Sequence, residues 1–385
     1  MPNEEMQRAR AELKAIGADW ALLTSRQNVT YVSHFETPVE YGFYADFAYV
    51  PPMCLVGVNQ AASALLVCNF YESWITERDA VDEIMTHETY PNAANFSAAE
   101  SFAASLRRAV REAGLTTGKA RLAVEIRCLP EVVCRVLAEE CPGLELIEGE
   151  AAVNRARQVK TARELDLLRQ AAEVNCFGMI EFTHQCRQAG KHEFAVWAAV
   201  ERALHTQARK AVYLFGDLIF GENMATQVNG PRDSATRAGD MGLLDSNVRV
   251  NGYWSDLCNT LVVGSVPPTP EQKRYGEAAR AAFYAAVEAL RPGRRARQVW
   301  EAANSVFQKY GLELPHHAGH QVGTSVNEEP RLLPFDESII QAGMVVCLEP
   351  GAYEGPGGAH GARLEKQVIV HASGPEIFPD FEFGF

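Results

Sequence analysis

The chain has 385 residues, a formal net charge of −13 at pH 7 and 47% hydrophobic residues. This length allows two domains, and the excess of acidic side chains argues against nucleic acid or an anionic membrane as a partner, because phosphate binding needs clustered positive charge. No apolar run reaches the roughly 20 residues of a membrane span, no amino-terminal h-region is visible, and the nine cysteines are scattered without CxxC spacing, so we expect a cytoplasmic protein with free thiols.

Residues 1–150 are expected to form a small α/β domain, because strand-like and helical patterns alternate there. Helices are predicted over residues 4–16, 98–113 and 130–137. Strands are predicted over residues 20–23, 53–58, 64–68, 122–126 and 144–147. Residues 28–35 form a further short apolar element whose type the pattern leaves open.

The second domain, residues 151–385, opens with a helix marked by a capping box. Thr161 and Thr269 each stand three residues before a Glu or Gln, and these side chains satisfy the free N–H groups at a helix start. We therefore predict helices beginning at these two threonines, and further helices over 193–204 and 295–310. Strands are predicted over 344–348 and 362–370.

A β-hairpin is predicted at Asn251-Gly252, which lies between two apolar runs, because both central residues of a type I′ turn need positive φ. The numbers of cross-strand partners then sum to 503, so Asn247 faces Asp256, and Asp245 lies two residues from Asn247 on the same face. Two carboxylates in a half-buried sheet repel each other, and they need either protonation or a metal ion.

Three more metal-binding candidates lie further along the chain. His320 belongs to the glycine-containing segment HHAGHQVG, and neutral imidazole is the commonest metal ligand. Glu349 follows the apolar run 344–348, and Glu365 lies inside the predicted strand 362–370. Carboxylates at such places are unfavourable in a core unless they are paired or coordinated, so the pattern indicates a divalent cation site.

The order Asp, Asp eleven residues later, GHxxG, LEPG and RxE resembles the catalytic domain of the pita-bread metallohydrolases, which include methionine aminopeptidase, prolidase, Xaa-Pro aminopeptidase and creatinase. The first domain is similar to the amino-terminal domain of the prolidase, Xaa-Pro aminopeptidase and creatinase branch, so the resemblance covers nearly the whole chain. It implies an α+β protein, with a small α/β creatinase-like domain (1–150) before a pita-bread catalytic domain (151–385) of antiparallel sheet with helices outside.

The resemblance also implies a site with two divalent metal ions (Mn, Co, Zn or Fe), whose ligands are Asp245, Asp256, His320, Glu349 and Glu365. By this resemblance Asp245 is bidentate on one metal, Asp256 and Glu365 bridge both, and His320 and Glu349 complete the other. Glu349 is the expected group for proton handling. The implied reaction is hydrolysis of an amide or peptide C–N bond in a small molecule or short peptide by metal-activated water, in a homodimer.

Two histidines that are usual in peptidases of this group are absent. Asn229 lies in the stretch before the first metal Asp where one of them is expected, and Asn327 replaces the histidine of HEEP. Asparagine can hydrogen-bond an oxyanion but cannot transfer a proton near neutral pH. His317, His360 and His34 are candidates to supply a protonic group, His34 by reaching the neighbouring subunit's site, as the resemblance to creatinase-like dimers implies.

Two arginines and two further functional classes complete the prediction. Arg331 could hold a substrate carboxylate or pair with a neighbouring glutamate, and Arg363 of RxE is expected beside the metal site.

The alternatives left open are a non-peptidase hydrolase of a small amide or amidine, or a lyase, and a non-catalytic binding protein on the same fold. The predicted catalytic residues are Glu349, Asn327 and His317, and the predicted substrate-binding residues are His34, Asn229, Arg331, His360 and Arg363.

Overall fold

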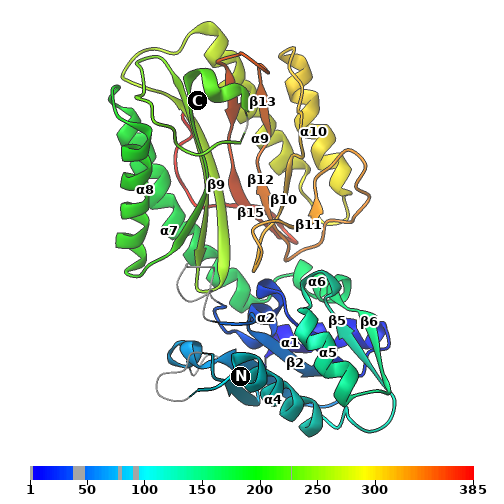
Figure 1. The fold of residues 1–385 in the computed structure, drawn as a ribbon. Helices are drawn as coiled ribbons and strands as arrows, with labels where there is room; N and C mark the ends of the chain where they lie inside the picture. The colour runs from blue at the N-terminus through cyan, green and yellow to red at the C-terminus, as the bar shows by residue number, and fades with distance from the viewer. Residues whose placement is uncertain (1–2, 38–47, 77–79, 90–94, 227) are drawn as a thin grey trace. The chain divides into compact units, whose positions relative to one another are not determined.

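A computed structural model describes residues 3–37, 48–76, 80–89, 95–226 and 228–385. The chain divides into two compact units, residues 1–157 and 158–385 (Figure 1). Each unit has its own buried apolar clusters, as expected for two separate domains. Among the residues that the model describes, no helix is long and apolar enough to cross a membrane.

The first unit is built on a six-stranded sheet of order β4-β3-β2-β1-β5-β6. Its strands are β1 (Trp20–Leu23), β2 (Met53–Gly57), β3 (Ser63–Cys68), β4 (Glu83–His87), β5 (Ala120–Val124) and β6 (Leu144–Glu148). The sheet is mixed, because β1 pairs antiparallel with β2 and parallel with β5. Short 3-10 helices follow β3 and β5, η1 (Asn69–Trp74) and η2 (Ile126–Cys128).

Helices cover both faces of this sheet. Their bounds are α1 (Glu4–Ala15), α2 (Arg26–Ser33), α4 (Ala98–Glu112), α5 (Glu131–Glu140) and α6 (Glu150–Gln158). Ala21 and Leu23 of β1 join the apolar cluster of α1, α2 and α6, whereas Trp20 and Leu22 join the cluster of α4 and α5. Side chains of a strand alternate between the two faces, so one short apolar strand supports both layers.

The element at residues 28–35, whose type the sequence pattern left open, is mainly helical and forms most of α2. Ser25 caps this helix, and its side chain accepts a hydrogen bond from the Asn28 amide. Glu125 also accepts hydrogen bonds from the amides of Thr24 and Ser25, at 2.6 and 2.8 Å. A buried carboxylate distant in sequence therefore stabilises the start of α2.

The described residues of the second unit form three antiparallel sheets, of order β7-β8-β9, β11-β10-β12-β15-β16 and β13-β14. The strands are β7 (Tyr213–Phe220), β8 (Met241–Val250), β9 (Tyr253–Val262), β10 (Gly319–Gln321), β11 (Glu328–Arg331), β12 (Val345–Leu348), β13 (Gly351–Tyr353), β14 (Gly361–Arg363), β15 (Lys366–His371) and β16 (Gly374–Phe378). A 3-10 helix, η3 (Gly221–Thr226), follows β7. An isolated bridge between Cys258 and Glu365 joins β9 to the segment between β14 and β15.

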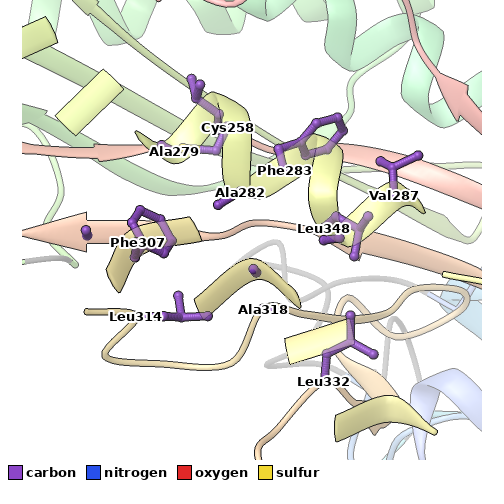
Figure 2. Packing of buried hydrophobic residues seen from close by; sticks show 14 of the residues in the cluster. Cys258, Ala279, Ala282, Phe283, Val287, Phe307, Leu314, Ala318, Leu332 and Leu348 are labelled. Carbon is purple, nitrogen blue, oxygen red and sulfur yellow. The ribbon is translucent and has the colours of Figure 1, made fainter. Parts of the chain in front are cut away.

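The helices that pack outside these sheets are α7 (Ala162–Cys186), α8 (Glu193–Ala208), α9 (Pro270–Ala289) and α10 (Ala296–Lys309). Helix α7 contacts β8 and β9, and α9 contacts β12, β13 and β14 (Figure 1). Figure 2 shows Ala282 and Phe283 of α9 in one buried cluster with Leu348 of β12. Both predicted capping boxes are present, at Thr161 and Thr269. The predicted antiparallel sheet with external helices is therefore confirmed.

One predicted strand is interrupted in the structure. The predicted strand 362–370 is two strands, because β14 ends at Arg363 and pairs with β13, whereas β15 begins at Lys366 and pairs with β12. Glu365 lies at the break, where its amide donates to the carbonyl oxygen of Cys258 at 2.9 Å. Glu365 therefore lies outside the regular β-ladders and forms an isolated bridge with Cys258 of β9.

Candidate metal centre

The hairpin of β8 and β9 carries the first two candidate ligands in the predicted register. Asn247 pairs with Asp256, and Asp245 pairs with Cys258, so every pair in this ladder sums to 503 as predicted. Asn251 and Gly252 have φ values of 52° and 85°, which a type I′ turn requires. Asn247 also donates a hydrogen bond from Nδ2 to Oδ1 of Asp245 at 3.0 Å. The turn therefore fixes the face on which both carboxylates lie.

His320 and Glu349 are brought together by the pairing of β10 with β12. His320 lies opposite Cys347, and the neighbouring Gly319 lies opposite Leu348. A Cβ atom at Gly319 would lie 2.0 Å from the carbonyl oxygen of Cys347, so only glycine allows this approach of the two strands. The amide of Glu349 donates to the carbonyl oxygen of Ala318 at 3.0 Å, which holds this glutamate beside the histidine strand.

All five predicted ligands converge in the folded chain. Among the residues that the model describes, Asp256, His320 and Glu365 form one group able to hold a metal ion, and Asp245, Glu349 and Glu365 form another. The ligand atoms within each group lie within 4.8 Å of one another. Each of the five residues is at most 8% exposed, and Glu365 is fully buried. Five polar side chains from separate segments of the chain therefore share one interior position.

The charges of this cluster require a positive counterpart. Burial, followed by the charges of neighbouring carboxylates, raises the pKa of Asp256 and of Glu365 well above their usual values. Oδ1 of Asp256 and both carboxylate oxygens of Glu365 are buried without a hydrogen-bond partner among the described residues. Buried carboxylate oxygens are unfavourable unless they are paired or coordinated. The donor set therefore fits divalent cations with oxygen and imidazole ligands.

The imidazole of His320 has the tautomer that a metal ligand needs. Its Nδ1 lies 2.9 Å from the carbonyl oxygen of Gln321, which can only accept, so Nδ1 carries the proton. Nε2 then faces Asp256 and Glu349, at 3.5 and 3.2 Å. Burial lowers the pKa of His320, but these two carboxylates outweigh burial and raise it to about 10. A metal cation bound at Nε2 would supply the positive charge that Asp256 and Glu349 favour at this position.

Arg363 supports the acidic side of the cluster. Its Nη2 donates to Oδ2 of Asp245 at 2.6 Å and to Oδ2 of Asp217 at 3.0 Å. Its Nη1 donates to the hydroxyl of Tyr353 at 2.9 Å. Arg363 is 5% exposed, so these contacts are made away from solvent. The guanidinium therefore fixes one oxygen of Asp245 and lies beside the candidate ligands, as the sequence motif led us to expect.

A pocket of about 350 Å³ opens over the cluster. Its lining includes the candidate ligands Asp245, Asp256, His320 and Glu349, together with Asn327, His317 and Arg363. Phe215, Val228 and Val326 also line it, and Phe215 and Val228 are 51% and 72% exposed. The pocket thus combines a charged floor with an apolar rim, a composition typical of small-molecule sites.

Two of the remaining predicted residues lie close to this pocket. Arg331 does not line it and instead contacts Nδ1 of His317 through Nε and Nη2, at 3.1 and 2.6 Å. Nε2 of His317 lies 2.8 Å from Oε1 of Glu349. The amide of Asn229 donates to Oδ1 of Asp217 at 3.0 Å, so this asparagine reaches the site through its backbone.

His360 does not line this pocket, and His34 belongs to the first unit. Nδ1 of His360 pairs with Oε2 of Glu354 at 2.8 Å, its ring stacks on Tyr275, and it lines a separate pocket of about 530 Å³. His34 ends α2, and its Nε2 lies 3.0 Å from Oε2 of Glu5. The substrate-binding roles of both histidines stay predictions.

Two titratable residues that line the pocket, Asp217 and His316, were not predicted from the sequence. Burial and the charge of Asp245 raise the pKa of Asp217 to about 6, although Arg363 lowers it. Burial lowers the pKa of His316 to about 4, so its ring is neutral. The available signal for Asp217 was an isolated acid in the apolar run LFGDLIF, which is the same argument that selected Glu365.

Comparison with known families matches both parts of the chain. The model of the Creatinase/Prolidase N-terminal domain matches residues 6–159, and the model of metallopeptidase family M24 matches residues 166–372. The predicted order of a creatinase-like domain followed by a pita-bread catalytic domain is therefore confirmed. Membership of this family does not favour the alternatives of a small-amide hydrolase, a lyase or a binding protein.

Individual relatives agree with the family match. The chain is 27% identical to YkvY of Bacillus subtilis over 374 residues, which cover 96% of this chain and 95% of that protein. It is 30% identical to the Xaa-Pro dipeptidase of Pyrococcus furiosus over 220 residues, which cover 57% and 62% of the two chains. The crystal structure of the prolidase from Pyrococcus horikoshii has the same fold, with a TM-score of 0.80, 21% identity and 99% coverage of both chains. Since a family model matches more than half of its length, this chain belongs to metallopeptidase family M24, and it is a metal-dependent hydrolase.

Proposed function

We propose that this protein is a dipeptidase of the Xaa-Pro type, which uses a pair of divalent cations to hydrolyse short peptides. The observation that carries the proposal is the convergence of Asp245, Asp256, His320, Glu349 and Glu365 in one buried cluster, with carboxylate oxygens that lack partners among the described residues. The Xaa-Pro preference rests on relatives, because a 30% identical protein is named Xaa-Pro dipeptidase and a structural neighbour is named prolidase.

Divalent cations bound to these five residues would supply a hydrolytic nucleophile at neutral pH and polarise the carbonyl group of the scissile bond. The protein contributes the remaining functions through its own side chains. Glu349 lines the pocket and can accept and return a proton beside the scissile bond. Asn327, which also lines the pocket, can donate a hydrogen bond to a developing oxyanion but cannot transfer a proton.

The pocket itself supports a short, partly apolar substrate. Its volume of about 350 Å³ suits a dipeptide or tripeptide and is too small for a folded protein. Phe215, Val228 and Val326 offer apolar contacts at the rim, where a side chain or a proline ring can be removed from water. The polar floor of the pocket would then orient the bound peptide, and the apolar rim would contribute to its binding affinity.

The direct test is a substrate comparison with enzyme reconstituted separately with Mn, Co, Zn and Fe. Xaa-Pro dipeptides should be hydrolysed faster than matched dipeptides in which alanine replaces proline, and tripeptides should be slower. A panel of small amides and amidines serves as the comparison class. Turnover of that panel without turnover of any dipeptide would replace the peptidase proposal with a metabolite hydrolase.

Metal content and assembly complete the proposal. We expect elemental analysis to find two equivalents of one of these four metals per chain, and light scattering to find a homodimer. Removal of metal by a chelator should abolish activity, and the same metal should restore it. Near-zero metal after reconstitution would contradict the proposed centre, whatever the outcome of the substrate comparison.

A further inference from the structure

His317 lies between an arginine and a carboxylate of the candidate metal centre. Nε and Nη2 of Arg331 lie 3.1 and 2.6 Å from its Nδ1, and Oε1 of Glu349 lies 2.8 Å from its Nε2. The side chain of His317 is 11% exposed, so water competes little for either contact. Arg331 lies opposite His320 in the pairing of β11 with β10, so the sheet holds the arginine in register with a candidate ligand.

The chemistry of arginine decides the tautomer of His317. A guanidinium group has five N–H donors and no acceptor, and it stays protonated in proteins. Nδ1 of His317 must therefore accept from Arg331, and in the neutral ring the proton lies on Nε2. Nε2–H then donates to Oε1 of Glu349, which as a carboxylate can only accept.

The two neighbouring histidines have the opposite arrangement. Nδ1 of His316 lies 2.7 Å from the carbonyl oxygen of His317, and Nδ1 of His320 lies 2.9 Å from that of Gln321. Carbonyl oxygens accept, so both of these rings carry a proton on Nδ1, and in the neutral ring Nε2 holds the lone pair. Among the three histidines of the HHAGH segment, His317 is thus the one whose neutral ring directs an N–H group from Nε2 toward Glu349.

We propose that Arg331 is a positioning residue that fixes His317 as an Nε2–H donor to Glu349. We further propose that this pair supplies the hydrogen bonding lost at Asn327 and in the stretch around Asn229, where histidines are expected. The inference rests on the proposed peptidase function for its role in turnover. His317 orients Oε1 of Glu349 and leaves Oε2 for proton handling. Arg331 does not line the pocket and is committed to His317, so it is not the clamp for a substrate carboxylate that the sequence analysis considered.

The tautomer can be measured without any assay of activity. Long-range proton–nitrogen spectra of zinc-loaded enzyme with nitrogen-15-labelled histidine distinguish Nδ1–H from Nε2–H rings, and the signals lost in His317→Asn identify His317. We expect an Nε2–H ring in the wild type and a mixture of tautomers in Arg331→Met. Arg295→Met, which removes an exposed arginine paired with Glu337, is the matched control and should leave the spectrum unchanged. An Nδ1–H ring in the wild type, or an unchanged ring in Arg331→Met, would overturn the proposal.

Kinetics test whether this tautomer matters to turnover. Arg331→Met should lower kcat on a dipeptide by about 10- to 100-fold with little change in KM, as loss of a residue that supports a metal ligand does. Glutamine can place an amide N–H near the position of Nε2–H and has no tautomers, so His317→Gln should retain more activity than His317→Ala. In the His317→Gln background Arg331→Met should cause no further loss.

A role as substrate clamp gives a different pattern. In that case Arg331→Met would raise KM, the rise would vanish on substrates whose carboxyl terminus is an amide, and the loss would add fully to that of His317→Gln. That pattern would overturn the proposal. If the wild type hydrolyses no dipeptide at all, the proposed function fails, whereas the spectra still decide whether Arg331 fixes the tautomer of His317.

Discussion

Arg363 and Asp245 form a buried ion pair, in which Nη2 lies 2.6 Å from Oδ2. The same guanidinium donates to Asp217 and Tyr353, so it serves three oxygen atoms from three strands. Lysine has one flexible ammonium group and cannot reproduce this fork. We therefore expect Arg363→Lys to weaken metal binding by about 10- to 100-fold while the protein stays folded. Competition with a metal indicator measures the change, and Arg295→Lys, at an exposed ion pair, should bind metal as the wild type does.

Asp256→Asn should remove both metal and activity. The substitution leaves an amide whose nitrogen cannot coordinate at a place where Oδ1 is buried without a partner among the described residues. Activity should fall by at least about 100-fold, the upper end of what loss of a supporting residue costs. Asp217→Asn is the matched control, because Asp217 lines the same pocket but belongs to none of the groups of described residues able to hold a metal ion, so the metal content of this variant should persist. Normal metal content in Asp256→Asn, with circular dichroism confirming the fold, would mean that the centre is misassigned.

Gly319→Ala should displace His320. The new methyl group would meet the carbonyl oxygen of Cys347 at 2.0 Å, which forces β10 away from β12. We expect a loss of about 1–3 kcal/mol in the free energy of unfolding, together with weaker metal binding. Gly374→Ala provides the control, because Gly374 also has positive φ, at 136°, but nothing lies within 4 Å of the added Cβ. Urea titration and metal titration of the two variants separate steric displacement from backbone strain, and equal effects on metal binding would contradict the prediction.

The first unit should lose stability in mild acid because of His87. This residue is 3% exposed, and burial lowers its pKa from 6.5 to about 4. The unfolded chain binds a proton at this residue more readily than the folded chain does. The contribution of buried, neutral His87 to the free energy of unfolding is therefore complete above pH 6.5 and is lost as the pH falls toward 4, by at most about 3 kcal/mol. Urea unfolding between pH 7 and 4.5 measures it. His87→Leu should flatten the dependence, whereas His184→Leu, at an exposed side chain, should not.

Phe215→Ser should weaken binding of peptides with large apolar side chains. Phe215 is half exposed at the rim of the pocket, where a bound apolar group would cover it. KM for such a peptide should rise about threefold or more because apolar contact area is lost, while kcat changes little. Phe335→Ser is the control, since Phe335 is 75% exposed and does not line the pocket. An equal rise in KM for a glycine dipeptide would show that the rim does not select apolar substrates.

The sequence determined those features that depend on local chemistry. The Asn251-Gly252 turn requires positive φ at both residues, and this alone fixed the register that sets Asp256 opposite Asn247. The capping boxes at Thr161 and Thr269 likewise marked two helix starts, because each threonine and its Glu or Gln partner lie within one helical turn. The order of the five candidate ligands, read as a motif, led to the family and the fold.

Tertiary structure decided whatever depends on a partner far along the chain. Helix α2 begins just after Thr24 and Ser25, whose amides donate to Glu125, and the strand around Glu365 is interrupted where Glu365 pairs with Cys258. Asp217 belongs to the site because it accepts a hydrogen bond from Arg363. His360 instead pairs with Glu354 and lines another pocket. Arg331 contacts His317 because β11 pairs with β10. Periodicity and turn chemistry report on neighbours in sequence, and hydrogen bonds of a buried side chain depend on which strands the fold brings together.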